Sequence, residues 1–185
     1  RMARALGALN LRREERVFVC MHDTVDYPVV FLGALHAGVV PVAINTLLTV
    51  DGYAYMLEHS RAQALVVSGA LLPTLQQAMA RGAHEVRHLI VSRPAGALPA
   101  GAHDLAALLA QQPAGPLAAA PTLADEIAFW LYSSGSTGRP KGTVHTHGNL
   151  YWTAETYGLP ILGLREDDVV FSAAKLFFAY GLGNA

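Results

Sequence analysis

Hydrophobic residues occur in two kinds of segment that alternate along this chain. Short runs rich in β-branched and aromatic residues predict buried strands, and longer stretches with apolar residues three or four positions apart predict amphipathic helices. The predicted strands are residues 17–21, 39–44, 64–68, 88–92, 127–133 and 169–173. The predicted helices are residues 2–9, 25–36, 51–59, 72–81, 105–111 and 149–157.

This alternation predicts an α/β fold. A strand, a helix and a second parallel strand form a right-handed crossover, so repeating the unit builds a mostly parallel sheet with helices on both faces. Residues 94–121 interrupt the pattern, because Ala, Pro and Gly dominate around one short helix, and they predict a surface excursion. Ligands of such sheets bind beyond the carboxyl ends of strands, which draws attention to the residues that follow 127–133.

Those residues belong to the sequence YSSGSTGRPKGT, which spans residues 132–143. Glycines let backbone N–H groups turn toward an anion, hydroxyl side chains add further donors, and a lysine adds a fixed positive charge. The composition predicts a loop that cradles a polyphosphate, with ATP as the favoured ligand. The residues expected to hold the phosphates are Ser133, Ser134, Gly135, Ser136, Thr137, Gly138 and Lys141.

Two other interpretations of this loop are disfavoured. A Walker A loop ends in a lysine at the start of a helix, whereas here Pro140 stands five residues after Gly135 and residues 142–144 favour an extended path. A helix is expected only near residues 147–150, with Asn149 as its cap. A flexible Ser/Gly linker would match the composition, but the preceding strand, the proline and the single lysine argue against it.

The loop resembles the phosphate-loop signature of the adenylate-forming enzymes, the superfamily of acyl-CoA synthetases, luciferases and peptide-synthetase adenylation domains. A second sequence, KLFFAYGLGN at residues 175–184, is similar to the aromatic motif that borders the acyl pocket in that superfamily. Most members have proline and histidine where this chain has Lys175 and Phe178, and the wording here resembles the benzoate-CoA ligase branch. Residues 17–75 resemble the same branch.

The resemblance implies that the chain forms part of the large N-terminal domain of an enzyme that uses ATP, Mg²⁺ and coenzyme A. Such an enzyme converts an aromatic carboxylate to an acyl-adenylate and then to a CoA thioester, releasing pyrophosphate and AMP. It implies that Lys141 is catalytic, that Thr137 lies near Mg²⁺, and that an apolar slot for the acid is bordered by Phe178, Ala179, Tyr180 and Gly181. A homodimer is compatible with it.

Composition limits the partners. The formal net charge of -1 gives no basic surface that would indicate nucleic acid or an anionic membrane. No run approaches the roughly 20 apolar residues of a membrane span. Cys20 is the only cysteine, which excludes an internal disulfide, fits a cytoplasmic location and predicts a small buried hydrophobe. A mean hydropathy of +0.31 predicts apolar surface meant for other parts of a longer protein.

Two histidines follow the phosphate loop closely, and a third follows the first predicted strand. His145 and His147 form an H-x-H pair, but no acidic or cysteine partner accompanies them at ligand spacing, so we expect a strand end and a helix start rather than a metal site. Whether His22 and Asp23, which follow the strand at 17–21, face a ligand is left open.

Abrupt ends suggest that residues 1–185 are an internal piece of an AMP-binding domain, without a C-terminal domain and inactive alone. The adenine and ribose motifs and the terminal lysine of the superfamily would then lie elsewhere. Alternatives left open are a hydroxybenzoate- or aminobenzoate-CoA ligase, a peptide-synthetase adenylation domain, and a nucleotide-binding module without catalysis.

Overall fold

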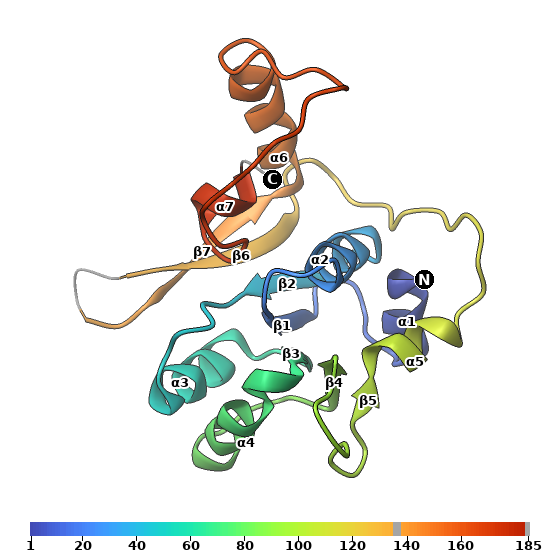
Figure 1. The fold of residues 1–185 in the computed structure, drawn as a ribbon, viewed down its shortest axis with the longest axis vertical. Helices are drawn as coiled ribbons and strands as arrows, with labels where there is room; N and C mark the ends of the chain where they lie inside the picture. Colours follow the sequence, from blue (N-terminus) through green and yellow to red (C-terminus); the bar gives the residue numbers. More distant parts are fainter. Residues whose placement is uncertain (135–137, 184–185) are drawn as a thin grey trace.

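Residues 1–134 and 138–183 are described by the computed structural model, and they form one seven-stranded sheet between layers of helices (Figure 1). The strand order is β5-β4-β3-β1-β2-β6-β7. Neighbouring strands are parallel except for β6 and β7, which are antiparallel. The predicted mostly parallel α/β fold is confirmed. The strands are β1 Arg16–Cys20, β2 Val40–Ala43, β3 Ala64–Ser68, β4 His88–Ser92, β5 His103–Asp104, β6 Ile127–Ser133 and β7 Lys141–Thr146.

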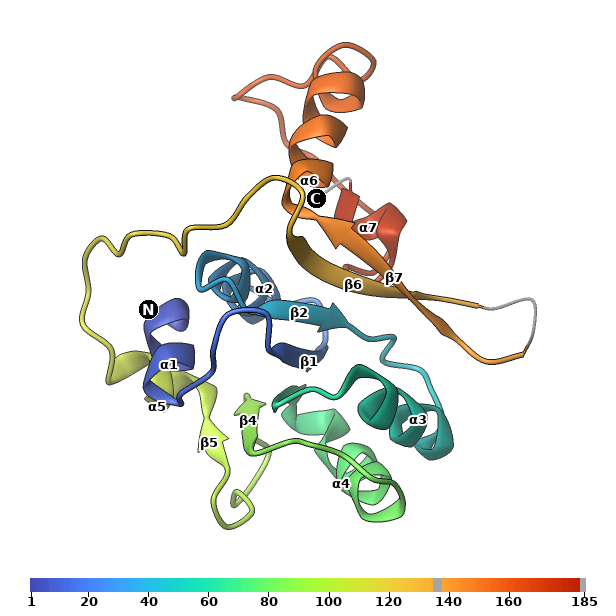
Figure 2. The same ribbon diagram turned by 180° about the vertical axis from the view of Figure 1, so that it is seen from behind.

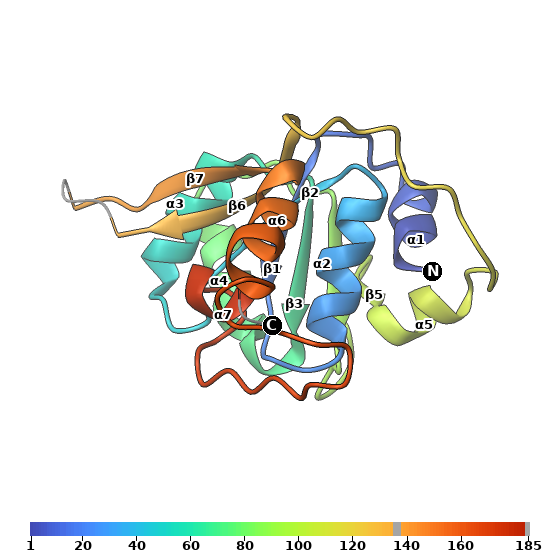
Figure 3. The ribbon, with the colours of Figure 1, turned by 90° about the horizontal axis from the view of Figure 1, so that it is seen from above.

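Helices cover both faces of this sheet, as predicted. One layer holds α1, α2 and α5, and the opposite layer holds α3 and α4 (Figure 3). The helices are α1 Met2–Ala8, α2 Asp26–His36, α3 Val50–Ser60, α4 Leu72–Arg81, α5 Leu105–Ala110, α6 His147–Thr153 and α7 Ala179–Gly183. A 3₁₀ turn, η1 at Gly69–Leu71, precedes α4, and a π-helical turn, η2 at Ala154–Gly158, continues α6.

The central strands are buried on both sides, which explains their nearly continuous apolar runs. Successive side chains of a strand point to opposite faces. Val17 and Val19 therefore pack in the cluster with α1 and α2, and Phe18 and Cys20 pack in the cluster with α3 and α4. Burial raises the pKa of the Cys20 thiol to about 12. The prediction that Cys20 is a small buried hydrophobe is confirmed.

Side chains define the starts of several helices. The Thr49 hydroxyl accepts a hydrogen bond from Gly52 N at 3.2 Å at the start of α3. A capping box begins α6, in which Thr146 is the N-cap and Asn149 Oδ1 accepts from Thr146 N at 3.3 Å. The expectation that Asn149 is itself the cap was therefore wrong by three positions, because Asn149 acts from the first turn of the helix.

The predicted strand at residues 169–173 is not a strand. This segment is irregular, and Val169 and Phe171 are 96% and 90% exposed. β-Branched residues favour a strand only where a neighbouring strand pairs with the backbone. No strand among the described residues lies beside this segment, so the propensity of 169–173 is not realised.

Residues 94–121 contain β5 and α5 and then run over the outside of α1 and α2 (Figures 1 and 2). Arg4 Nη2 donates to Pro116 O at 2.8 Å, Ala120 N donates to His36 O at 2.9 Å, and Arg13 pairs with Glu126 at 2.6 Å. These contacts fasten the segment to the sheet domain before β6. Within the described ranges, no helix combines the length and the apolar character needed to cross a bilayer.

Candidate active site

The carboxyl ends of β1, β2, β3, β4 and β6 share one edge of the sheet, because these strands are parallel. Ser133, the last residue of β6, pairs with Lys141, the first residue of β7. The strands on either side of the predicted phosphate loop therefore form an antiparallel hairpin, and Ser133 ends β6 at the edge where ligands of parallel sheets usually bind. Register fixes which residues face each other at the base of the hairpin, since a slip by one residue would turn every side chain to the other face.

Four of the seven predicted phosphate ligands are described. Ser133, Ser134, Gly138 and Lys141 are all exposed to solvent. Gly138 has φ +89, a left-handed conformation that L side chains rarely adopt, which explains its glycine. Lys141 enters none of the ion pairs formed within the described part of the chain, so its charge is available to a ligand. Gly135, Ser136 and Thr137 lie outside the described residues.

A cavity of about 210 Å³ lies at the base of the loop. Ser133, Ser134 and Pro140 of the hairpin line it, together with Asn45 after β2 and Phe177 and Phe178 of the second motif. Phe177 is buried at 4% exposure, whereas Phe178 is 47% exposed. The two motifs, more than thirty residues apart in sequence, therefore meet at one cavity that is lined by both hydroxyl-bearing and aromatic side chains.

The rest of the second motif lies around α7. Ala179 lines a separate cavity of about 240 Å³ with Phe129, His145 and Leu182. Gly181 is buried, and a Cβ at this position would lie 2.1 Å from Lys175 O, so only glycine fits. Tyr180 is 70% exposed. The predicted acyl residues thus flank two neighbouring cavities, with Phe178 at the first and Ala179 at the second.

Asp23 and Tyr27 hold the second motif against the sheet. Asp23 Oδ1 accepts from Leu176 N at 3.3 Å, Asp23 Oδ2 lies 3.6 Å from Lys175 Nζ, and the Tyr27 hydroxyl donates to Leu176 O at 3.3 Å. Burial raises the pKa of Tyr27, which keeps the phenol protonated as a donor. The described partners of Asp23 are the Leu176 backbone and the Lys175 side chain, and no local sequence signal marks a contact across 153 positions.

The H-x-H pair has structural roles, as expected. His145 lies near the end of β7 and stacks on Phe129, with ring centroids 4.6 Å apart and planes 2° apart. Burial lowers the pKa of His145, which favours the neutral ring. His147 begins α6. Within residues 1–134 and 138–183, no group of three or more His, Cys, Asp or Glu side chains could hold a metal ion.

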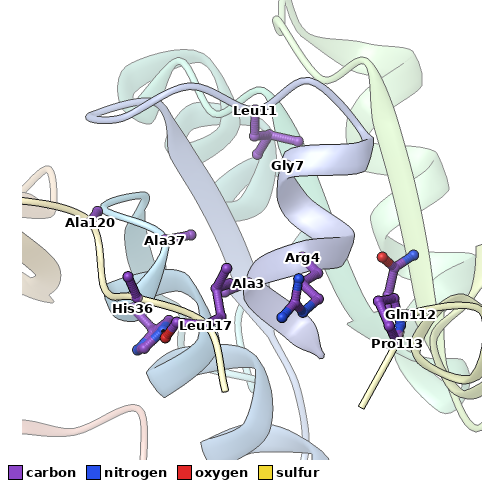
Figure 4. Close-up of a pocket in the computed structure, with 11 residues that line it drawn as sticks. Ala3, Arg4, Gly7, Leu11, His36, Ala37, Gln112, Pro113, Leu117 and Ala120 are labelled. Carbon is purple, nitrogen blue, oxygen red and sulfur yellow. Dashed lines mark hydrogen bonds between the residues drawn. The ribbon is translucent and has the colours of Figure 1, made fainter. Parts of the chain in front are cut away.

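A cavity of about 460 Å³ lies elsewhere (Figure 4). It is enclosed by α1, the end of α2 and residues 112–120, and its labelled polar side chains are Arg4, His36 and Gln112. His36 Nε2 lies 2.9 Å from Leu117 O, so this side chain is already used to fasten the crossing segment. None of the residues predicted for phosphate or acyl binding lines this cavity.

Comparison with known proteins agrees with the geometry. The profile of the family described as AMP-binding enzyme matches residues 1–185. The chain belongs to this AMP-binding enzyme family. The benzoate–CoA ligase of Thauera aromatica is 56% identical over 95% of this chain and 32% of its own length. The 4-hydroxybenzoate–CoA/benzoate–CoA ligase of Rhodopseudomonas palustris is 49% identical over the whole chain and 33% of its own length.

Two solved structures of AMP-binding relatives resemble the fold closely. A benzoate CoA ligase from Burkholderia xenovorans LB400 has a TM-score of 0.87 and 55% identity, over 98% of this chain and 34% of its own. An anthranilate CoA ligase in complex with anthranoyl-AMP has a TM-score of 0.93 and 34% identity, over 99% of this chain and 35% of its own. The chain spans about a third of the length of the curated relatives it matches.

Proposed function

We propose that this chain is part of an AMP-forming acid–thiol ligase that activates benzoate or a closely similar aromatic carboxylate with ATP and coenzyme A. The observation that carries the proposal is the cavity at the carboxyl edge, which is lined by the predicted phosphate ligands Ser133 and Ser134 together with Phe178. A reaction between an aromatic acid and ATP needs phosphate donors and an apolar wall beside each other. The names of the similar benzoate–CoA ligases support the same assignment.

In the first half-reaction, a carboxylate oxygen attacks the α-phosphorus of MgATP. The bond from that phosphorus to the bridging oxygen breaks, and pyrophosphate leaves with the electron pair. Negative charge grows on the departing group, so donors fixed in advance lower the barrier without reorganising. In the proposal, Lys141 and the hydroxyl and N–H groups of residues 133–138 supply these donors, with Lys141 as the catalytic cation.

In the second half-reaction, the thiol of coenzyme A loses its proton and its sulfur attacks the acyl carbon, which expels AMP. None of the described groups is assigned to this step. Mg²⁺ enters with ATP as part of the substrate, because this ion typically keeps water and binds through phosphate oxygens. Its assigned protein contact, Thr137, lies outside the described residues, and the assignment rests on the resemblance alone.

The acid is assigned to the aromatic class because the aromatic residues Phe178 and Tyr180 flank the small residue Ala179, which leaves room for a flat ring. Hydroxybenzoate and anthranilate occur in the names of other similar ligases. A panel of benzoate, 4-hydroxybenzoate, 2-aminobenzoate and propionate therefore tests the substrate class. A cytoplasmic location belongs to the proposal, as does a homodimer, which light scattering on the full-length protein tests.

The decisive experiment is acid-dependent exchange of labelled pyrophosphate into ATP by the full-length protein, followed by CoA-dependent release of AMP. We expect both activities with benzoate and little with propionate. Binding of ATP without exchange for any acid would favour a nucleotide-binding module and overturn the proposal.

We also propose that residues 1–185 do not complete the reaction alone, because the chain spans only about a third of its relatives. Purified residues 1–185 with benzoate, MgATP and CoA should release AMP at the background rate in a coupled assay. Turnover above background would contradict this.

A further inference from the structure

Two side chains of α3 contact the base of the phosphate loop from outside the loop. Tyr55 and His59 are four residues apart, so they lie on the same face of the helix, and their rings are 5.5 Å apart. The Tyr55 hydroxyl donates to Pro140 O at 3.1 Å. His59 Nδ1 lies 2.8 Å from the Tyr132 hydroxyl. These contacts reach both strands of the hairpin.

Each contact is one residue away from a predicted phosphate ligand. Tyr132 immediately precedes Ser133 on β6, and Pro140 immediately precedes Lys141 on β7. Ser133 and Lys141 are themselves paired across the hairpin. A shift of either stem residue would therefore move the ligand beside it, at the point where the hairpin leaves the rest of the sheet.

Ring contacts surround the two hydrogen bonds. The guanidinium of Arg139 lies over the Tyr55 ring, 5.4 Å from its centroid. The His59 ring packs edge-on against Tyr132 at 5.7 Å. A Cβ at Gly142 would lie 3.2 Å from Trp130 and 3.6 Å from His59, so the β7 backbone passes close to both rings. The base of the hairpin is thus held by ring contacts as well as by the two hydrogen bonds.

Both hydrogen bonds at the base of the hairpin involve a tyrosine hydroxyl, a group that ordinarily keeps its proton near neutral pH. Burial raises the pKa of Tyr132, so its phenol stays protonated at neutral pH. A phenol can donate and accept, and the contact with His59 is therefore available to either neutral tautomer of the imidazole. The Pro140 carbonyl receives the hydroxyl of Tyr55 in the half-buried zone beneath the loop.

We propose that Tyr55 and His59 are positioning residues for ATP, which hold Ser133 and Lys141 in place through Tyr132 and Pro140. This inference rests on the proposed use of the loop for ATP phosphates. Stabilising charge on pyrophosphate requires donors placed to within a fraction of an ångström. Helix α3 is anchored in the sheet core through Met56 and Leu57, and it therefore gives the two side chains a rigid support.

The test uses the full-length protein with Tyr55→Phe, Tyr132→Phe and the double variant. Tyr55→Phe removes one hydroxyl and keeps the ring beneath Arg139. The matched control is Tyr53→Phe, on the same helix, whose hydroxyl accepts from Leu48 N and does not contact the hairpin. Readouts are the Kd for MgATP, the KM for ATP and kcat in pyrophosphate exchange, thioester formation from supplied benzoyl-adenylate, and Tm.

One hydrogen bond contributes modestly, so each single variant should lose about 3- to 10-fold in kcat/KM for ATP during adenylation. The KM for benzoate and the thioester half-reaction should change less than twofold. The double variant should lose more than either single variant, and because both tyrosines contact His59 its loss need not equal the product of the two single losses. Tyr53→Phe should leave ATP binding unchanged even if its Tm falls.

Equal losses in both half-reactions, tracking Tm, would mean a merely structural role and overturn the proposal. ATP binding and adenylation unchanged in Tyr55→Phe and Tyr132→Phe, or an equal loss of both in Tyr53→Phe, would overturn it too. If wild-type protein binds MgATP but exchanges no pyrophosphate with any acid, the proposed function fails, and the Kd values alone then decide the positioning role.

Discussion

The first four strands and the last two show how differently one sheet can be built. Every residue of β3 is buried, and β1 is buried except for its first residue. None of the residues of β7 is buried, and the segment after α6 exposes large apolar side chains such as Ile161 at 69%. The first region is a packed core, and the second is a hairpin and an irregular segment fastened to that core.

The candidate site residues lie almost entirely on the second region. They are joined to the core by the pairing of β6 with β2, by buried side chains such as Phe129 and Phe177, and by polar contacts from α3 and from the start of α2. Binding residues are often placed on exposed segments positioned by a rigid scaffold. Damage to the core should therefore affect stability first, whereas damage to the hairpin or to the aromatic motif should affect chemistry first.

The largest expected effect is on the core. Phe18 in β1 is fully buried, so Phe18→Ala should lower the free energy of unfolding by about 3–5 kcal/mol. Phe171→Ala, at a side chain that is 90% exposed, is the matched control and should cost less than about 0.5 kcal/mol in residues 1–185. Urea unfolding followed by circular dichroism measures both. Equal costs would remove the distinction between the two regions.

Lys141→Ala should affect catalysis strongly and stability little, which is the reverse of the expectation for Phe18→Ala. Loss of one donor to the departing pyrophosphate typically lowers the rate by about 10²- to 10³-fold, so adenylate formation should fall by that factor in the full-length protein. Thioester formation from supplied acyl-adenylate should be nearly unchanged, and so should Tm, because Lys141 is exposed. Arg12→Ala removes another exposed cation, outside the site, as a control. Equal losses in both half-reactions would make Lys141 structural.

Ala179→Phe tests which cavity receives the acid. Overpacking a fitted site costs roughly 1–3 kcal/mol, which is about 5- to 150-fold in kcat/KM for benzoate. Propionate should lose much less, because it need not reach the blocked volume. The comparison variant is Phe178→Ala, which opens the neighbouring cavity beside Ser133. If benzoate is affected by Phe178→Ala and not by Ala179→Phe, the aryl ring belongs to that cavity.

The smallest effect concerns Asp26, which joins α2 to the end of β4. Burial raises the pKa of Asp26, but hydrogen bonds from Ser92 Oγ at 2.7 Å and Arg93 Nε at 2.9 Å outweigh it and hold the pKa below its ordinary value. A lowered folded-state pKa adds stability above the unfolded value of about 3.9, and this stability is lost as the pH falls through the folded value.

Asp26→Asn should therefore lower the free energy of unfolding by about 0.5–1.5 kcal/mol at neutral pH. The difference from wild type should shrink below about pH 4. Unfolding curves between pH 3 and pH 8 measure it. A difference that stays constant over this range would mean that the charge of Asp26 contributes nothing.

Local patterns predicted the parts of the fold that depend on local burial. The run Val17 to Met21 could be recognised as a strand because both of its faces are buried. The predicted phosphate loop could be recognised because the residues that suggest it are consecutive in the sequence, at 132–143. The run at 169–173 has the same propensity but no described neighbour to pair with, so the same reasoning failed there.

The contacts that position the candidate site could not be predicted from local sequence patterns. Tyr55 and His59 read as ordinary members of an amphipathic helix, and their partners lie 85 and 73 positions away. The cap at Thr146 and the two-residue β5 are also set by neighbours and not by composition. Residue chemistry thus indicates what a site needs, and tertiary contacts decide which other residues hold it.

The link between Asp23 and Leu176 has a consequence for how the protein acquires its shape. The two residues are 153 positions apart, so the end of β1 must wait for almost the whole chain before this bond can close. At ribosomal rates of about 5–20 residues per second, that interval is roughly 8 to 30 s. The parallel core can assemble meanwhile from shorter-range crossovers, whereas the aromatic motif docks late, since distant contacts carry the larger entropy of closure. A newly made chain therefore has a packed scaffold before the aromatic motif closes the cavity at the base of the hairpin.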